Sequence, residues 1–111
     1  MQLNQLIQRA KEIRAKYEIL ETKRYGKSWT PSQIAEGFVG DMGDLMKIVM
    51  AKQGVRKMDD VDSKLAHELA DCLWSVLILS DKFNVDIEKA FSSTMDHLET
   101  TIDGILEPKK E

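Results

Sequence analysis

The chain has 111 residues and a formal net charge of -3, from 16 Lys and Arg residues against 19 Asp and Glu residues. This length predicts one domain, and the scattered charges form no continuous basic face of the kind that follows a nucleic-acid backbone. With 42% hydrophobic residues, 32% charged residues and two prolines, the composition is typical of a globular helical protein. These features argue against a disordered or fibrous protein and against a nucleic acid polymer as partner.

The first predicted helix covers residues 2–22. Its apolar residues recur every three or four positions, as on one face of a helix: Leu3, Leu6, Ile7, Ala10, Ile13, Tyr17 and Leu20. Charged residues interrupt the segment too often for a secretory signal or a membrane span. We therefore expect a cytoplasmic protein with no membrane partner.

A capping box opens the second predicted helix. Thr30 is a suitable N-cap, Pro31 suits the first helical position, and Gln33 follows three residues after the cap. Apolar residues keep the helical period to Met50, and Gly54 is expected to end the helix. Three glycines lie within it: Gly37, Gly40 and Gly43. Each lowers the stability of the helix by roughly 1 kcal/mol relative to alanine. They form a bare strip that we expect to let a neighbouring helix or a triphosphate approach closely.

Polar connections precede the third and fourth predicted helices. Asp62 or Ser63 can cap the third helix, which is expected to end near residues 83–84. Asp86 can cap the fourth helix, whose apolar period extends to about residue 106.

The four predicted helices indicate an all-α fold, a four-helix bundle-like domain over residues 1–106. Residues 107–111 are expected to form a flexible tail. Cys72 is the single cysteine, which excludes an internal disulfide, and its apolar neighbours predict a buried, unreactive thiol.

Two acidic pairs lie on consecutive predicted helices. Asp41 and Asp44 are three residues apart, and Glu68 and Asp71 have the same spacing, so each pair shares one helix face. In an antiparallel hairpin, residues whose numbers add to the same total lie level with one another. Asp41 is then level with Asp71, and Asp44 with Glu68, about a midpoint at Arg56 in the connection. The four carboxylates can therefore face one another.

Four carboxylates at close range repel one another and need cations. Oxygen ligands without histidine or cysteine favour Mg²⁺ or Mn²⁺ over zinc, and Mg²⁺ commonly takes further ligands from phosphates. A carboxylate box therefore suits a nucleoside triphosphate. The alternative is that these acids are solvated surface charges. Glu68 and Asp71 fit that alternative less well, because "HELADCLWSVLILS" embeds them in a nearly continuous apolar segment.

About residues 29–91 resemble the MazG-like, all-α nucleoside triphosphate pyrophosphatase superfamily, in which E-x-x-E on one helix precedes E-x-x-D on the next. The resemblance lies in "SWTPSQIAEGFVGDMGDLMKIVMAKQG" and "KLAHELADCLWSVLILSDKFNVDIEKAF". It implies a MazG fold completed as a homodimer or dimer of dimers. The implied reaction is Mg²⁺-dependent or Mn²⁺-dependent hydrolysis of a (deoxy)nucleoside triphosphate to monophosphate and pyrophosphate, in nucleotide-pool housekeeping. The implied metal ligands and catalytic residues are Asp41, Asp44, Glu68 and Asp71, with aspartates at the first two positions in place of the family's glutamates.

The resemblance also suggests residues that contact the substrate. Asp86, besides being an N-cap, would lie near the metals. Trp29 would stack on the base or pack as a staple against the core, and Trp74 would form a wall of the base pocket or pack in the core. The fourth helix lacks the basic residues with which many relatives hold phosphates. The substrate would then contact other polar residues: Lys47, Lys52, Arg56, Lys82 and Asn84.

Two other functions stay open from the sequence. One is a catalytically weak helical module that binds a nucleotide or a metal, and the other is a helical assembly protein with acidic surface charges. His67 is adjacent to Glu68, but neighbouring helical residues point about 100° apart. We therefore expect His67 at a solvent or interface position.

Overall fold

Residues 1–107 are described by the computed structural model, and they contain four α-helices and no strand. The helices are α1 (Leu3–Tyr25), α2 (Pro31–Lys52), α3 (Val61–Lys82) and α4 (Ile87–Leu106). The prediction of an all-α fold is confirmed. The predicted tail lies outside the described residues apart from Glu107. Within the described part of the chain, no helix combines the length and the hydropathy that a membrane crossing requires.

The first helix is longer than its apolar pattern indicates. It continues to Tyr25 instead of residue 22 and ends at Gly26, which has a left-handed φ of 82° and donates its N–H to the carbonyl of Thr22 at 2.9 Å. The polar last turn carries Lys23 and Arg24, whose positive charges suit the carbonyl end of a helix.

The caps predicted for α2 and α4 are confirmed. The Thr30 hydroxyl accepts from the Gln33 N–H at 3.2 Å, and the Gln33 side chain accepts from the Thr30 N–H at 2.9 Å. At the start of α4, an Asp86 oxygen accepts from the Lys89 N–H at 3.1 Å.

The predicted cap of α3 is wrong. The helix begins at Val61, and its N-cap is Asp60, which has a left-handed φ of 55°. Asp62 lies in the first turn, where its carboxylate pairs with Lys52 at the end of α2. Asp62 therefore joins the two helices across the connection instead of capping one of them.

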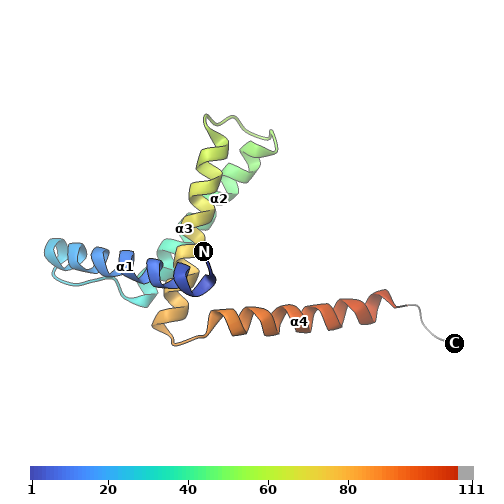
Figure 1. The fold of residues 1–111 in the computed structure, drawn as a ribbon. Helices are drawn as coiled ribbons and strands as arrows, with labels where there is room; N and C mark the ends of the chain where they lie inside the picture. Colours follow the sequence, from blue (N-terminus) through green and yellow to red (C-terminus); the bar gives the residue numbers. More distant parts are fainter. Residues whose placement is uncertain (108–111) are drawn as a thin grey trace.

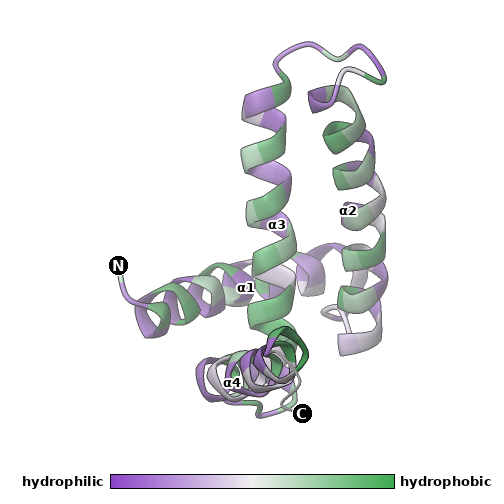
Figure 2. Cartoon of the chain, turned by 90° about the vertical axis from the view of Figure 1, so that its right-hand side faces the viewer, coloured by the Kyte–Doolittle hydropathy of each residue, from purple (hydrophilic) through white to green (hydrophobic). Residues whose placement is uncertain are grey.

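The core lies where α1 crosses the hairpin formed by α2 and α3. Figures 1 and 2 show α2 and α3 side by side, with α1 crossing near the end of α3 that leads to α4. The core residues come from all three helices: Ala10, Ile34, Leu77 and Ile78. Trp74 packs against them and donates its indole N–H to the Ala10 carbonyl at 3.1 Å.

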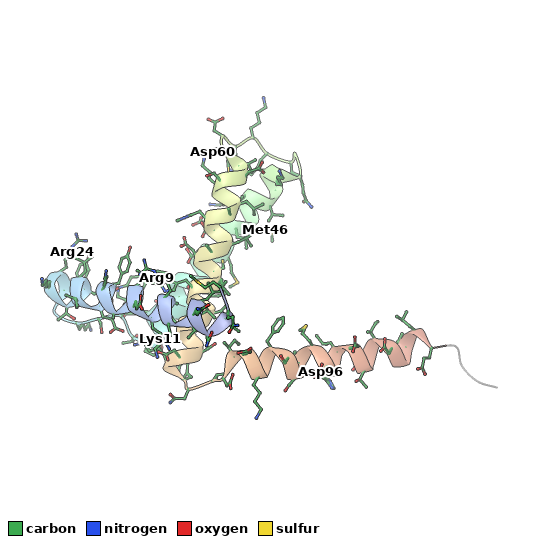
Figure 3. The ribbon with its side chains drawn as sticks, in the orientation of Figure 1. Arg9, Lys11, Arg24, Met46, Asp60 and Asp96 are labelled. Atoms are coloured by element: carbon green, nitrogen blue, oxygen red, sulfur yellow. The ribbon has the colours of Figure 1, made fainter. Side chains whose placement is uncertain are left out.

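The fourth helix extends away from this core. None of its residues is buried against the described part of the chain, and Figure 3 shows Asp96 on α4 far from Met46 and Asp60 on the hairpin. The radius of gyration is 18.5 Å, against about 13 Å for a compact chain of this length. Within one chain, the described helices therefore do not close into the predicted bundle.

Candidate metal and ligand site

Three of the four predicted carboxylates form a cluster between α2 and α3. Asp41, Asp44 and Glu68 each offer one oxygen, and these oxygens lie within 4.8 Å of one another. The antiparallel hairpin produces this arrangement, because it brings the acidic face of α2 level with that of α3. We call these three residues the carboxylate cluster.

Glu68 is the member of the cluster with the most unusual environment. Its Oε1 is buried and has no hydrogen-bond partner among the described residues. Burial raises the pKa of Glu68 above its usual value, and the negative charges of Asp41, Asp71 and Asp44 raise it further. The charged form is therefore costly unless a cation lies beside it.

Asp71, the fourth predicted carboxylate, lies beside the cluster and not within it. Its Oδ2 is 3.1 Å from Nε2 of His67 on the preceding turn of α3. His67 is exposed, as expected, but its link to Asp71 was missed in the sequence. The signal was the spacing of four residues, which places two helical side chains together.

The donor set fits a hard divalent cation. The cluster consists of carboxylates alone, which suits Mg²⁺ or Mn²⁺, and the buried oxygen of Glu68 lacks a partner within residues 1–107. The partly buried Asp41 and Glu68 would lie on the inner side of such an ion, and the exposed Asp44 on its outer side.

A cavity of about 450 Å³ adjoins the cluster between α1, α2 and α3. Asp41 and Asp71 line it together with three aromatic side chains: Tyr17, Trp29 and Trp74. The rings of Tyr17 and Trp74 pack with centroids 5.6 Å apart and planes inclined at 53°. We call this space the aromatic cavity.

The predicted aromatic residues both line the aromatic cavity. Trp29 is 44% exposed and lines the cavity together with the core residue Ile34, so its position is compatible with both the stacking role and the staple. It lies against Gly37, where an added Cβ would be 3.3 Å from the ring. Trp74 has both of its expected positions, since it packs against the core and also lines the cavity.

A buried ion pair on α1 forms one wall of the aromatic cavity. Arg14 and Glu21 each retain 9% of their side-chain exposure, and an Arg14 N–H donates to Oε1 of Glu21. The same Glu21 oxygen accepts from the backbone N–H of Trp29 at 2.8 Å. The pair therefore fixes the segment that carries Trp29. The seven-residue spacing of Arg14 and Glu21 along one face of α1 was the sequence signal for their proximity.

A second cavity, of about 440 Å³, lies on the other side of the cluster. Asp44 and Glu68 line it together with Lys47 and Lys64, and we call it the lysine cavity. His67 lines both cavities. The carboxylate cluster therefore lies between an aromatic space and a basic one.

The other predicted ligands lie elsewhere in the structure. Lys52 pairs with Asp62, and Lys82 donates to Glu18 on α1 at 2.8 Å. The remaining three are exposed and line neither cavity: Arg56 in the α2–α3 connection, Asn84 in the left-handed turn before α4, and Asp86 at the α4 cap. The structure does not bring these residues to the cluster.

The single cysteine lies close to the acidic residues. Cys72 is partly buried, and desolvation, followed by the charge of Asp41, raises the pKa of its thiol. This environment disfavours the reactive thiolate, in agreement with an unreactive thiol.

Comparisons of the chain with protein-family models, curated proteins and solved structures found no match.

Proposed function

We propose that the chain is a metal-dependent pyrophosphohydrolase that converts a (deoxy)nucleoside triphosphate to its monophosphate and pyrophosphate. The observation that carries the proposal is the carboxylate cluster, with a buried and unpartnered oxygen on Glu68, placed between an aromatic cavity and a lysine cavity. The acidic spacing that resembles the MazG-like superfamily agrees with this function. Nucleotide-pool housekeeping is the expected role.

Asp41, Asp44 and Glu68 would hold Mg²⁺ or Mn²⁺, and Asp71 would support them from the adjacent turn. A bound cation would polarise the phosphoryl oxygens and neutralise the charge that develops on them. One carboxylate of the set would act as general base and take the proton of the attacking water. His67, whose Nε2 lies 3.1 Å from Oδ2 of Asp71, would help to hold Asp71 in a fixed orientation.

The two cavities support one orientation of the bound nucleotide. The base would stack against the rings of Trp29 and Trp74 in the aromatic cavity, and the α-phosphate would lie at the cluster. Pyrophosphate would leave on the opposite side, where Lys47 and Lys64 can neutralise part of its charge.

An assay of pyrophosphate release over a panel of ribonucleoside and deoxynucleoside triphosphates tests this function. We expect turnover of at least one substrate with Mg²⁺ or Mn²⁺ and none with a chelator. Asp96→Asn on α4 is a matched control because it removes an exposed carboxylate away from the cluster. Absence of turnover with every nucleotide, together with no change of melting temperature on adding either metal, would overturn the proposal.

A nucleotide-binding or metal-binding module without turnover is the second candidate. The shorter side chains at Asp41 and Asp44 favour it, because the family that the chain resembles has glutamates there. Saturable binding of a metal or a nucleotide without release of product would distinguish the module from the enzyme.

We also propose that a second copy of the chain covers the apolar face of α4. The exposed apolar residues of this helix form a stripe along one side: Phe91, Met95, Leu98, Ile102 and Ile105. Covering such a face removes apolar surface from water at about 25 cal/mol per Å². In a homodimer, or in a dimer of dimers, a second copy of the chain would bury this stripe, and no further partner would be needed.

A further inference from the structure

The connection between α1 and α2 is held by one side chain. Within residues 1–107, the backbone of residues 27–29 makes a single hydrogen bond, in which the Trp29 N–H donates to Oε1 of Glu21 at 2.8 Å. The ends of the connection are the C-cap of α1 at Gly26 and the N-cap of α2 at Thr30. Between these two caps, the course of the backbone therefore depends on Glu21.

Glu21 is itself held in place by burial and by charge. Its side chain retains 9% exposure, and the same Oε1 accepts from the guanidinium of Arg14 on α1. A hydrogen bond to an ionised carboxylate is stronger than one to a neutral acceptor. Glu21 also lines the aromatic cavity, but this oxygen is engaged by the Arg14 and Trp29 donors.

The first helix holds both tryptophans that line the aromatic cavity. Through Glu21 it fixes the backbone of Trp29, whose ring lies against Gly37. It also accepts the indole N–H of Trp74 at the Ala10 carbonyl, at 3.1 Å. The walls of the aromatic cavity therefore depend on hydrogen bonds to α1 as well as on the hairpin.

We propose that Glu21 is a positioning residue for base recognition. It acts through the Trp29 backbone and holds the Trp29 ring where a planar heterocycle can stack on it. A ligand that meets a ring already in place does not have to order it, so its affinity is higher. The inference rests on the proposed function for the identity of the ligand as a nucleobase.

Binding of uncharged nucleosides to the metal-free full chain tests the proposal without turnover. Adenosine, cytidine, guanosine and uridine are titrated by calorimetry, and we expect at least one of them to bind the wild type. Glu21→Ala removes the acceptor of the Trp29 N–H. We expect it to weaken binding of that nucleoside at least about tenfold, because the ring is displaced.

Two further variants separate positioning from charge and from general stability. Glu21→Gln keeps a carbonyl acceptor without the charge, and we expect its affinity to stay within about threefold of the wild type. Glu18→Ala is the matched control on α1. It removes ion pairs with Lys82 and Arg14 but leaves the acceptor of Trp29 in place, so it should bind like the wild type.

Three results would overturn the proposal. The first is a folded Glu21→Ala protein that binds nucleosides as tightly as the wild type. The second is a Glu21→Gln protein that binds as weakly as Glu21→Ala, which would assign the effect to charge. The third is a wild type that binds none of the four nucleosides.

Amide hydrogen exchange of the wild type tests the same link if Glu21→Ala does not fold. At about ten times its dissociation constant, a nucleoside that requires the held ring should slow exchange of the Trp29 N–H about tenfold. The internal control is the Gln53 N–H at the end of α2, which donates to the Val49 carbonyl at 3.0 Å. Unchanged exchange at Trp29, or equal slowing at Gln53, would refute the positioning role.

This inference and the proposed function fail separately. Nucleoside affinity that depends on Glu21, without hydrolysis of any triphosphate, removes the enzyme and keeps the positioning residue. Turnover by a folded Glu21→Ala protein with the wild-type KM keeps the enzyme and removes the positioning residue.

Discussion

At the scale of single residues, Glu68 combines a buried oxygen that lacks a partner within residues 1–107 with two neighbouring carboxylates. Replacing it by glutamine removes one negative charge and keeps the shape of the side chain. We expect Glu68→Gln to abolish turnover and to leave the metal-free melting temperature unchanged or slightly raised, since repulsion within the cluster decreases. A large loss of metal-free stability would instead assign Glu68 a structural role.

The raised pKa of Glu68 also predicts how stability depends on pH. Above the usual value of 4.5, the folded protein retains the Glu68 proton that the unfolded chain has already released. The free energy of unfolding of the metal-free protein therefore falls as the pH rises from about that value through the folded pKa. Metal binding displaces the same proton and strengthens over the same pH range.

Urea denaturation of the metal-free wild type and of Glu68→Gln over this pH range measures the effect. The wild type should lose stability relative to the variant as the pH rises. Parallel stability curves for the two proteins would show that Glu68 has an ordinary pKa.

Sequence reasoning located the acids and aromatic residues of the site but missed Arg14 and Glu21. The acids were visible because their spacing repeats on two helices. Charged residues on an amphipathic helix are ordinarily solvated, and the burial of this pair arises from packing of α1 against the other helices and from the turn that carries Trp29. That burial depends on contacts between elements that the local pattern does not encode.

At the scale of elements, the three glycines of α2 differ in their surroundings. An added Cβ at Gly37 would lie 3.3 Å from Trp29, whereas Gly40 and Gly43 face open space in the described structure. Only Gly37 therefore supports the expected close approach, and its neighbour is the Trp29 ring instead of another helix.

Alanine substitutions at two of these glycines distinguish an effect on the stability of α2 from an effect on ligand binding at the site. Gly40→Ala should raise the free energy of unfolding by up to about 1 kcal/mol, because alanine favours the helix and meets no neighbour. Gly37→Ala should displace the Trp29 ring and weaken nucleoside binding at least about threefold, since the ring lines the aromatic cavity.

Urea denaturation and nucleoside titration of both variants measure these effects. Weaker metal binding in Gly40→Ala would support the close approach of a triphosphate to the bare strip. Unchanged nucleoside binding in Gly37→Ala would show that the position of Trp29 does not limit recognition.

Helix boundaries were predictable where local chemistry determines them. Thr30 and Asp86 cap their helices through side-chain bonds within three residues, so the sequence is sufficient. The cap of α3 was mispredicted because Asp62 pairs with Lys52 across the connection, a contact between two helices. Asp60 takes the cap position with a left-handed backbone instead.

At the scale of the whole molecule, the sequence predicted four amphipathic helices but not the course of α4. The apolar period of this helix indicates a covered face, yet within the described chain the helix extends away from the core. Its direction cannot be derived from contacts within one chain, because the core forms from α1, α2 and α3.

Leu98→Asp places a charge in the middle of the exposed apolar stripe of α4. If a second copy covers this stripe, we expect the wild type to sediment as a dimer or larger assembly and the variant to shift toward monomer. Thr100→Asp is the matched control, because two helical positions place it on a different face of α4. A wild type that stays monomeric at all concentrations would contradict the proposed dimer.

The carboxylate cluster is the centre of the proposed site, and titration with Mn²⁺ followed by electron paramagnetic resonance tests it most directly. We predict saturable binding to the wild type and to Asp96→Asn, with affinity at least about tenfold weaker in Glu68→Gln. Absence of binding to the wild type, or equal binding to Glu68→Gln, would contradict a metal site at Asp41, Asp44 and Glu68.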